Sequence, residues 1–324
     1  MAIADFRFGH MRSPLENCER LLALALVCLC ASFALPQKSN DQQTVDDSSR
    51  QIVLDRFNKA RPVAEVTNAL RRNRNRANAL LRRPVYRRKG SSDTRTPSAS
   101  SDDLGVTVWR LRPSRPADEG ARVVVLSGLK RSELIPERIE ADTPLNIGDR
   151  VRLSIESPKS GYLYVVDREA YADRSFGDAM LIFPTLRTRG GDNWVEPGKL
   201  IDIPAQEDQY PYFTAQPAGD RRDQVSEELT IILTPKSLNF KIGDQPLNVS
   251  RQEIADWEKL WGGAVERLEL VGGAGQTWTK EEKEAGTTNG HRLTQTGPAP
   301  QTIYRVAARR AGAFLVTVRL RYAK

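Results

Sequence analysis

Carboxylates are the residues of this chain best suited to chemistry, and several of them follow a Tyr-rich stretch. Asp167, Glu169, Asp173 and Asp178 lie within one short segment. Glycoside hydrolysis needs only one carboxylic acid and a second carboxylate a few ångströms away. Because arginines are interleaved with these acidic residues, the segment also has the pattern of a solvated loop held by weak surface ion pairs. We expect the solvated loop and keep glycan hydrolysis as the alternative.

Histidine and cysteine are too scarce for the other common kinds of site. The chain has two histidines and three cysteines, and only His291 lies outside the first 34 residues. Zinc sites take three or four ligands, mostly of these types. The acidic segment lacks the spacing of a calcium loop, and neither a G-x-S-x-G elbow nor a P-loop motif occurs. The sequence predicts no metal, cofactor or catalytic residue, and it places His291 in an exposed turn.

Aromatic residues form a second set of candidates. Trp194 follows a glycine-rich turn that contains Asp192, and three more rings lie in a polar segment, at Tyr210, Tyr212 and Phe213. Exposed aromatic rings on loops often act as anchors for carbohydrate, peptide or protein. The competing interpretation is that these rings cap the edge of the core. We take these five residues as the predicted ligand-binding positions.

Residues 146–184 carry the clearest signal of the elements that must position these groups. Val151, Leu153 and Ile155 alternate with polar residues, as in a strand with one buried face. Residues 162–166 are apolar on both alternating faces, which indicates a central strand. The run 180–183 repeats this character, and turn-forming residues separate the three segments.

Further segments extend the pattern into a mainly β chain. Strands are expected near residues 106–111, 122–126, 200–204, 229–234, 268–271, 302–307 and 313–322. Ser250 and Glu253 have the spacing of a capping box, so they predict the start of an amphipathic helix at about 250–266 that lays Trp257 and Trp261 on a sheet. The predicted fold is a β-sandwich or small barrel with this helix in its C-terminal part. We expect residues 105–324 to form one unit, with two domains as the alternative.

Four segments of the expected sheet carry a resemblance to a known family. They read GDRVRLSIESPKSGYLYVVDRE, LIFPT, EPGKLIDIP and EELTIILTP. Together they resemble the bacterial domain of unknown function 4384, over roughly residues 145–235. The resemblance implies a β-rich accessory module, found elsewhere beside kinase or caspase-like peptidase domains, with no catalytic residues to carry over. No kinase or peptidase motif accompanies the module here, and residues 236–324 form a C-terminal extension.

The N-terminal region predicts export. Residues 21–35 form an uncharged run that is short for a membrane-spanning helix, and small residues precede a cleavage point after Ala34. We interpret residues 1–34 as a signal peptide, with an uncleaved membrane anchor as the alternative and a start at Met1 or Met11. All three cysteines lie in this leader, so the mature chain would contain no thiol. The expected location is periplasmic or extracellular.

Residues 35–104 are expected to form a disordered basic linker. The whole chain has 49 basic and 41 acidic residues, a net charge of +8, and this stretch alone has 15 basic and 8 acidic residues. For an exported chain this charge predicts contact with an anionic membrane surface rather than nucleic acid. A solvated spacer is the other interpretation, because residues 90–103 have a disordered composition. The contact residues would be Arg71, Arg72, Arg74, Arg76, Arg82, Arg83, Arg87, Arg88 and Lys89.

These patterns converge on one functional expectation. The chain should be an exported, non-catalytic binding or accessory module that acts at the cell envelope. Its partner, an unknown protein or an envelope polysaccharide, is not specified by the residues. A carboxylate-based hydrolase that acts on envelope glycans and a purely structural envelope protein are the alternatives.

Overall fold

The computed structural model describes residues 53–64, 84–89, 101–127, 130–208, 210–217, 221–307 and 312–323. The chain divides into a unit over residues 1–40 and a second over residues 41–324, and every element described below belongs to the second. The predicted signal peptide lies outside the described residues. Within the part that is described, no helix is both long and apolar enough to cross a membrane.

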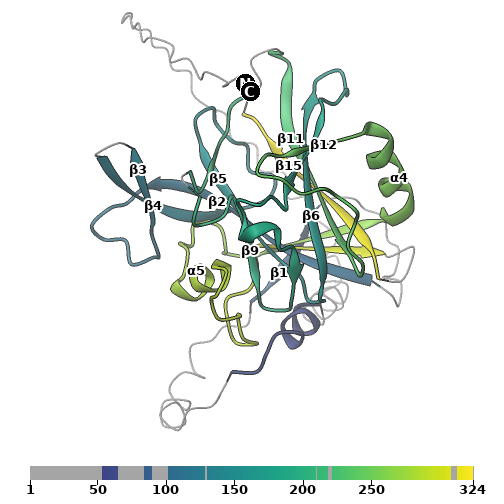
Figure 1. Cartoon of the computed structure of the whole chain (residues 1–324). Helices are drawn as coiled ribbons and strands as arrows, with labels where there is room; N and C mark the ends of the chain where they lie inside the picture. Colours follow the sequence, from purple (N-terminus) through teal and green to yellow (C-terminus); the bar gives the residue numbers. More distant parts are fainter. Residues whose placement is uncertain are drawn as a thin grey trace, which may run out of the picture. The chain divides into compact units, whose positions relative to one another are not determined.

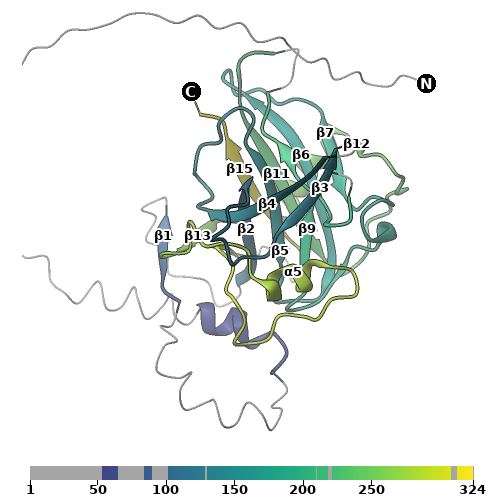
Figure 2. The same cartoon turned by 90° about the vertical axis from the view of Figure 1, so that its left-hand side faces the viewer.

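One antiparallel sheet has nine strands, and Figure 1 labels β2, β5 and β9 among them. They are β1 (Tyr86–Lys89), β2 (Ser101–Pro113), β3 (Val123–Ser127), β4 (Lys130–Ile139), β5 (Arg150–Glu156), β9 (Leu200–Ile203), β10 (Phe213–Thr214), β13 (Val265–Leu270) and β14 (Thr302–Ala307). The pairing order is β1-β13-β14-β2-β4-β3, and β5 pairs with β2, β9 and β10. Figure 2 shows β1 beside β13 at one side of this sheet.

A second antiparallel sheet has six strands. They are β6 (Gly161–Tyr171), β7 (Ala179–Phe183), β8 (Trp194–Val195), β11 (Gln224–Thr234), β12 (Leu247–Val249) and β15 (Phe314–Arg321). The order is β12-β7-β6-β11-β15, with β8 paired to the start of β6. The three expected strands of residues 146–184 are therefore present as β5, β6 and β7, but β5 belongs to one sheet and the other two to its partner.

The main core lies between the two sheets. Side chains of β2 and β5, such as Val106 and Leu153, pack in one buried cluster with those of β6, β11 and β15. The strand expected near residues 313–322 is confirmed as β15, in which Phe314, Val316 and Val318 belong to this cluster while Thr317 and Arg319 are exposed. The mainly β prediction and its sandwich form are confirmed.

Helix α4 (Arg251–Trp261) covers the outer face of the second sheet. Its capping box is formed as predicted, with the Ser250 hydroxyl accepting from the Glu253 amide. Trp257 and Trp261 stack on each other at 6.1 Å and pack against the sheet. The helix ends at Trp261 rather than near residue 266, because Gly262 adopts an extended conformation (φ −66°, ψ 141°) and the chain enters β13.

The linker prediction is wrong for three parts of residues 35–104. A helix over residues 53–59 buries Val53, Leu54 and Phe57. β1 pairs with β13, and Tyr86 joins the same buried cluster. β2 begins at Ser101, four residues earlier than the expected start of order. These few apolar residues find their partners far away in the sequence, which is why local composition hides them. The rest of the predicted linker lies outside the described residues.

Helix α5 (Lys280–Gly286) covers part of the first sheet beside β9. Thr279 and Glu282 form its capping box, as their spacing indicates. The sequence patterns do not indicate β1, β4, β8, β10 or β12. β4 reads KRSELIPERI, in which charge and a proline conceal the strand, and the other four are too short to show a period.

Candidate functional site

Three inward-facing rows of the second sheet change from apolar to polar at the same end of the sheet. In β6 the row passes from Val165 to Asp167, and in β11 it passes from Leu229 to Glu227. Asp167 lies directly opposite Leu229, so Glu227 is its diagonal neighbour on the same face. The third row belongs to β15, where it passes from Val318 to Leu320, and Tyr322 continues it just beyond the end of the strand. The register of three strands thus brings an acidic pair and a phenol to one end of the sandwich.

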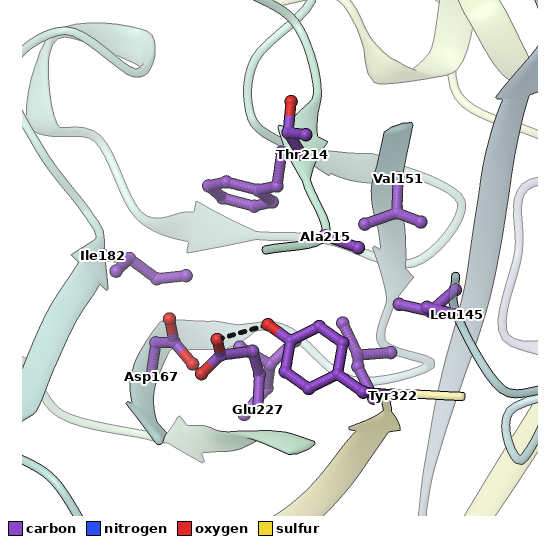
Figure 3. Close-up of a pocket in the computed structure, with 11 residues that line it drawn as sticks. Leu145, Val151, Asp167, Ile182, Thr214, Ala215, Glu227 and Tyr322 are labelled. Atoms are coloured by element: carbon purple, nitrogen blue, oxygen red, sulfur yellow. Dashed lines mark hydrogen bonds between the residues drawn. The ribbon is translucent and has the colours of Figure 1, made fainter. Parts of the chain in front are cut away.

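These groups line a pocket between the sheets with a volume of about 130 Å³. Figure 3 shows the carboxyl groups of Asp167 and Glu227 side by side, with Tyr322 beside Glu227. The other lining residues are mostly apolar, and several come from β5, β7, β10 and the segment before β5. They are Leu145, Val151, Ile182, Phe213, Thr214, Ala215, Leu229 and Leu320. The pocket is therefore apolar in its walls and acidic at one side.

The hydrogen bonds satisfy this acidic pair only in part. The Tyr322 hydroxyl donates to Glu227 Oε1 at 2.8 Å, and Gln224 Nε2 donates to the same oxygen at 2.7 Å. Among the residues that the structure describes, Asp167 Oδ1 and Glu227 Oε2 are buried without a hydrogen-bond partner. A buried carboxylate oxygen without a donor is unfavourable. Two such oxygens in one pocket therefore point to a ligand or a shared proton.

The pKa values of the pair reflect this environment. Burial, and then the charge of Glu227, raises the pKa of Asp167 to about 8. Burial also raises the pKa of Glu227, although the hydrogen bonds from Tyr322 and Gln224 oppose the change. Like charges at close range cannot both ionise easily, so the two protons leave in steps that belong to the pair. The charge of Glu169 also raises both pKa values, so the pair holds a proton to higher pH than isolated carboxyl groups would.

This arrangement permits two kinds of chemistry. A protonated carboxyl beside a carboxylate can act as an acid and base pair, provided that a substrate bond reaches it. The same pair can bind an organic cation, because a positive charge relieves the repulsion between the carboxylates. A metal centre has less support, since the described part of the chain contains no group of three or more His, Cys, Asp or Glu side chains placed to hold an ion.

The other predicted carboxylates do not join the pocket lining. Glu169 accepts a hydrogen bond from the Tyr171 hydroxyl. Asp173 pairs with Arg221 at 3.1 Å, and Asp178 has a side chain that is 77% exposed. The solvated-loop interpretation therefore fits Asp173 and Asp178, whereas Glu169 still belongs to β6 and Asp167 is a pocket residue.

The predicted aromatic positions lie in two separate places. Phe213 is paired with Val151, at the first residues of β5, and it lines the pocket. Trp194 is paired with Tyr162, next to the turn that follows β5, and their rings meet edge to face at 5.0 Å. Val151 and Glu156 are five positions apart along β5, which corresponds to roughly 17 Å. One aromatic surface that contains both rings is therefore not formed.

The remaining predicted ligand-binding residues have structural contacts of their own. Tyr212 lies under the Arg150 guanidinium at 5.0 Å, and Tyr210 meets Tyr212 edge to face at 6.5 Å. Asp192 is exposed and pairs with Arg189 at 3.0 Å. Only Phe213 among the five residues lines the acidic pocket.

The predicted arginine cluster is described at three positions. Arg87, Arg88 and Lys89 belong to β1. Arg88 pairs with Glu266 at 2.6 Å, and Lys89 pairs with Glu140, so only Arg87 of the three is exposed. The two pairs weaken the predicted contact of β1 with an anionic surface. The other six arginines of the cluster lie outside the described residues.

Sequence reasoning missed Glu227 and Tyr322. Both continue an apolar alternation, Leu229-Ile231-Leu233 in one strand and Val316-Val318-Leu320 in the other. The signal that could have revealed them was a polar residue at a position where the alternation of each strand predicts an inward-facing apolar one. It becomes meaningful only once the pairing of β6, β11 and β15 is known.

The fold and the pocket together define the described chain as an antiparallel β-sandwich with a carboxyl-lined pocket at one end. Within it, residues 144–226 match a family model described as domain of unknown function DUF4384. This match confirms the resemblance expected for about residues 145–235. It includes Asp167 and Phe213 but ends one residue before Glu227, so the C-terminal part of the chain completes the pocket. Comparisons with curated proteins and with solved structures gave no match.

Proposed function

We propose that this chain is an exported, non-catalytic binding module of the cell envelope that holds an amine-bearing group in the pocket of Asp167 and Glu227. The observation that carries the proposal is the pair of buried carboxyl oxygens without partners among the described residues. An ammonium group supplies both the missing donors and the missing positive charge. The partner would be an envelope polysaccharide or protein with free amino groups.

The pocket walls support the same class of ligand. Figure 3 shows Val151 and Ile182 above the acidic pair, and Phe213 also lines the pocket. This apolar surface suits the carbon stem of an amine. An apolar cavity of about 150 Å³ holds a molecule of the size of benzene, so a pocket of about 130 Å³ takes one side chain or a short amine. The ligand is therefore an amino group that projects from a larger partner.

Binding of a small amine tests this proposal. n-Butylammonium chloride should shift the NMR signals of residues around Asp167 in the whole chain at pH 7. Asp167→Asn and Glu227→Gln should each weaken binding by about tenfold or more, because a lost charged hydrogen bond is worth roughly 1.5–3 kcal/mol.

Asp178→Asn and Glu119→Gln are the matched controls, since both residues have exposed side chains that do not line the pocket. They should leave amine binding within about twofold of the parent, a change of roughly 0.4 kcal/mol. Equal loss in the control and pocket variants, or no binding by the parent chain, would contradict the proposal.

Export is a separate part of the proposal. It is supported by the uncharged run over residues 21–35 and by the absence of cysteine after residue 30. Cell fractionation with N-terminal sequencing should recover a chain that begins at Leu35. A cytoplasmic chain that retains residues 1–34 would refute export and leave the pocket unaffected.

The carboxylate-based hydrolase is a second candidate, and one observation favours it. The raised pKa of Asp167 keeps it protonated beside a second carboxyl, as a general acid requires. Hydrolysis of amino-sugar polymers by the parent chain, lost in Asp167→Asn but kept in Asp192→Asn, would establish this function in place of simple binding.

A further inference from the structure

A second and larger concavity lies on the outer face of the same sheet. Its volume is about 960 Å³. In β11, Ser226 and Glu228 line this groove while Glu227 and Leu229 line the acidic pocket, because successive residues of a strand face opposite ways. The groove is thus distinct from the acidic pocket, although Tyr322 contributes to both.

The charge of the groove is the reverse of that of the pocket. Its lining includes Arg174, Arg222, Arg319 and Arg321 against the single carboxylate of Glu228, which gives four positive charges and one negative, a net +3. The charge of Arg319 is already neutralised, because its side chain forms an ion pair with the buried Glu228. The side chains of the other three arginines are exposed, and no ion pair or hydrogen bond joins them to another residue in the described part of the chain.

The acidic groups that the structure describes beside the groove do not cancel this charge. Asp173 and Asp223 lie beside the groove, and both pair with Arg221, at 3.1 and 2.5 Å. This cluster of one arginine and two aspartates lowers the local total only from +3 to +2. Hydrogen bonds from the hydroxyl and the backbone amide of Ser175, together with one from Arg221, lower the pKa of Asp173 to about 2. The carboxylate of Asp173 therefore stays ionised and bound to Arg221.

The backbone at Arg174 is strained in a way that presents its side chain at the groove. Its φ is +69°, a left-handed conformation that glycine or asparagine adopts far more easily than arginine. The turn is closed by a hydrogen bond from the Arg174 amide to the Tyr171 carbonyl at 3.0 Å. A strained position that keeps an unpaired arginine is an argument for function.

The rim of the groove adds apolar surface to the positive charge. Ile147 is 71% exposed and Val225 is 41% exposed, and both line the groove together with Phe176. Exposed aliphatic side chains beside unpaired arginines suit a ligand that has an anionic head and an apolar part.

We propose that this groove binds a phosphate-bearing ligand through Arg174, Arg222 and Arg321. A guanidinium presents a planar fork of donors that matches phosphate oxygens, and three unpaired guanidinium groups match a polyanion or a clustered headgroup. A volume of about 960 Å³ admits a lipid headgroup or several units of a phosphate-bearing polymer. This inference goes beyond the proposed function, because it concerns a different surface and the opposite ligand charge.

The test uses the whole chain and two probes. One probe is vesicles of phosphatidylglycerol in phosphatidylcholine, with pure phosphatidylcholine as the blank, and the other is soluble inorganic polyphosphate. The test variant combines Arg174→Gly, Arg222→Gln and Arg321→Gln, where glycine keeps the left-handed turn without strain. The charge-matched control combines Arg115→Gln, Arg187→Gln and Lys236→Gln, three exposed cations outside the groove lining.

The parent should bind at least one probe. The test variant should lose about tenfold or more in affinity, and the charge-matched control should lose less than about threefold. The reason is that three contacts to phosphate contribute a salt-dependent affinity that distant charges do not. Binding to vesicles alone identifies a lipid headgroup, binding to polyphosphate alone a soluble polymer, and binding to both a general phosphate site.

Equal losses in the two triple variants, or no binding to either probe, would overturn the inference. Asp167→Asn should keep phosphate binding unchanged, so failure of the amine proposal and failure of this one are distinguishable.

Discussion

Buried charge is treated in opposite ways in two regions of this molecule. On the outer face of the first sheet, three buried arginines each face a buried carboxylate, in the pairs Arg61–Glu156, Arg138–Glu282 and Arg152–Asp202. Between the sheets, Asp167 and Glu227 face each other with no cation among the pocket lining. In the first region the charges are neutralised by ion pairs within the chain. In the second region the acidic pair has no such counter-ion in the pocket lining, so a ligand could supply the positive charge.

The paired region explains how the peripheral segments are held. Arg61 makes a two-point contact with Glu156 of β5, with both bonds at 2.7 Å, and so ties the segment after the helix of residues 53–59 to the sheet. Arg138 of β4 pairs with Glu282 of α5. These pairs join elements far apart in the sequence, so their role is structural. The comparison teaches that burial alone does not mark a site here, and that the acidic pair differs from the ion pairs in having no cation among the residues that line its pocket.

Asp202→Asn should have the largest effect of the changes that test this comparison. Arg152 and Asp202 lie 3.1 Å apart, and their side chains are 0% and 1% exposed. Removing the anion leaves the arginine buried and uncompensated, which costs about 3–5 kcal/mol. Urea unfolding of the variant should show this loss, with Asp178→Asn as the exposed control. A loss below about 1 kcal/mol would mean that these pairs are not needed.

Asp167→Asn should have the opposite effect at high pH. The pKa of Asp167 is raised from 3.8 to about 8, so between these values the folded chain keeps a proton that the unfolded chain releases. Stability from this group is complete below about pH 4 and falls as the pH rises toward 8. The amide carries no charge, so the variant should be more stable than the parent by about 1–3 kcal/mol at pH 8 and no more stable at pH 4.

Urea unfolding at the two pH values measures this difference. Asp178→Asn should show the same pH dependence as the parent. If Asp167→Asn were destabilising at pH 8 and neutral at pH 4, Asp167 would have a cationic partner, and the contrast between the two regions would disappear.

The comparison also shows how far the sequence alone could lead. Alternation and turn residues predicted β5, β6, β7 and β15, because those signals are local. The acidic pair depends on which strands are neighbours, and Asp167 and Glu227 are 60 positions apart, so no local pattern joins them. The helix of residues 53–59 was hidden for the same reason: its three buried residues pack against strands from the far end of the chain.

Tyr322→Phe should have a smaller effect on the unpaired region. It removes the hydroxyl that donates to Glu227 Oε1 at 2.8 Å, a bond that holds the pKa of Glu227 lower than burial alone would. The variant should lose about 0.5–1.5 kcal/mol at pH 7, and less at pH 4, because the raised pKa of Glu227 leaves less negative charge there for the hydroxyl to stabilise. An equal loss at both pH values would assign the hydroxyl a packing role instead.

Trp194→Ala should have the smallest effect on the pocket. Its ring contacts Tyr162 at the opposite end of β5 from Phe213. Amine binding should change by less than about twofold, or roughly 0.4 kcal/mol, as measured by the same NMR titration. Phe213→Ala is the comparison variant and should weaken binding, because Phe213 lines the pocket. A larger loss for Trp194→Ala than for Phe213→Ala would move the ligand site to the other end of the sandwich.

The central measurement is a pH titration of the Asp167 and Glu227 carboxyl carbons by NMR, in the free chain and with saturating n-butylammonium. In a buried pair of carboxyl groups without a counter-ion, at least one carboxyl should titrate far above its ordinary range. The bound cation should shift that titration to lower pH. The account is contradicted if both carboxyl groups titrate near pH 4 and the amine leaves their titration unchanged. The acidic pair would then be stabilised within the chain, and the pocket would not bind an amine.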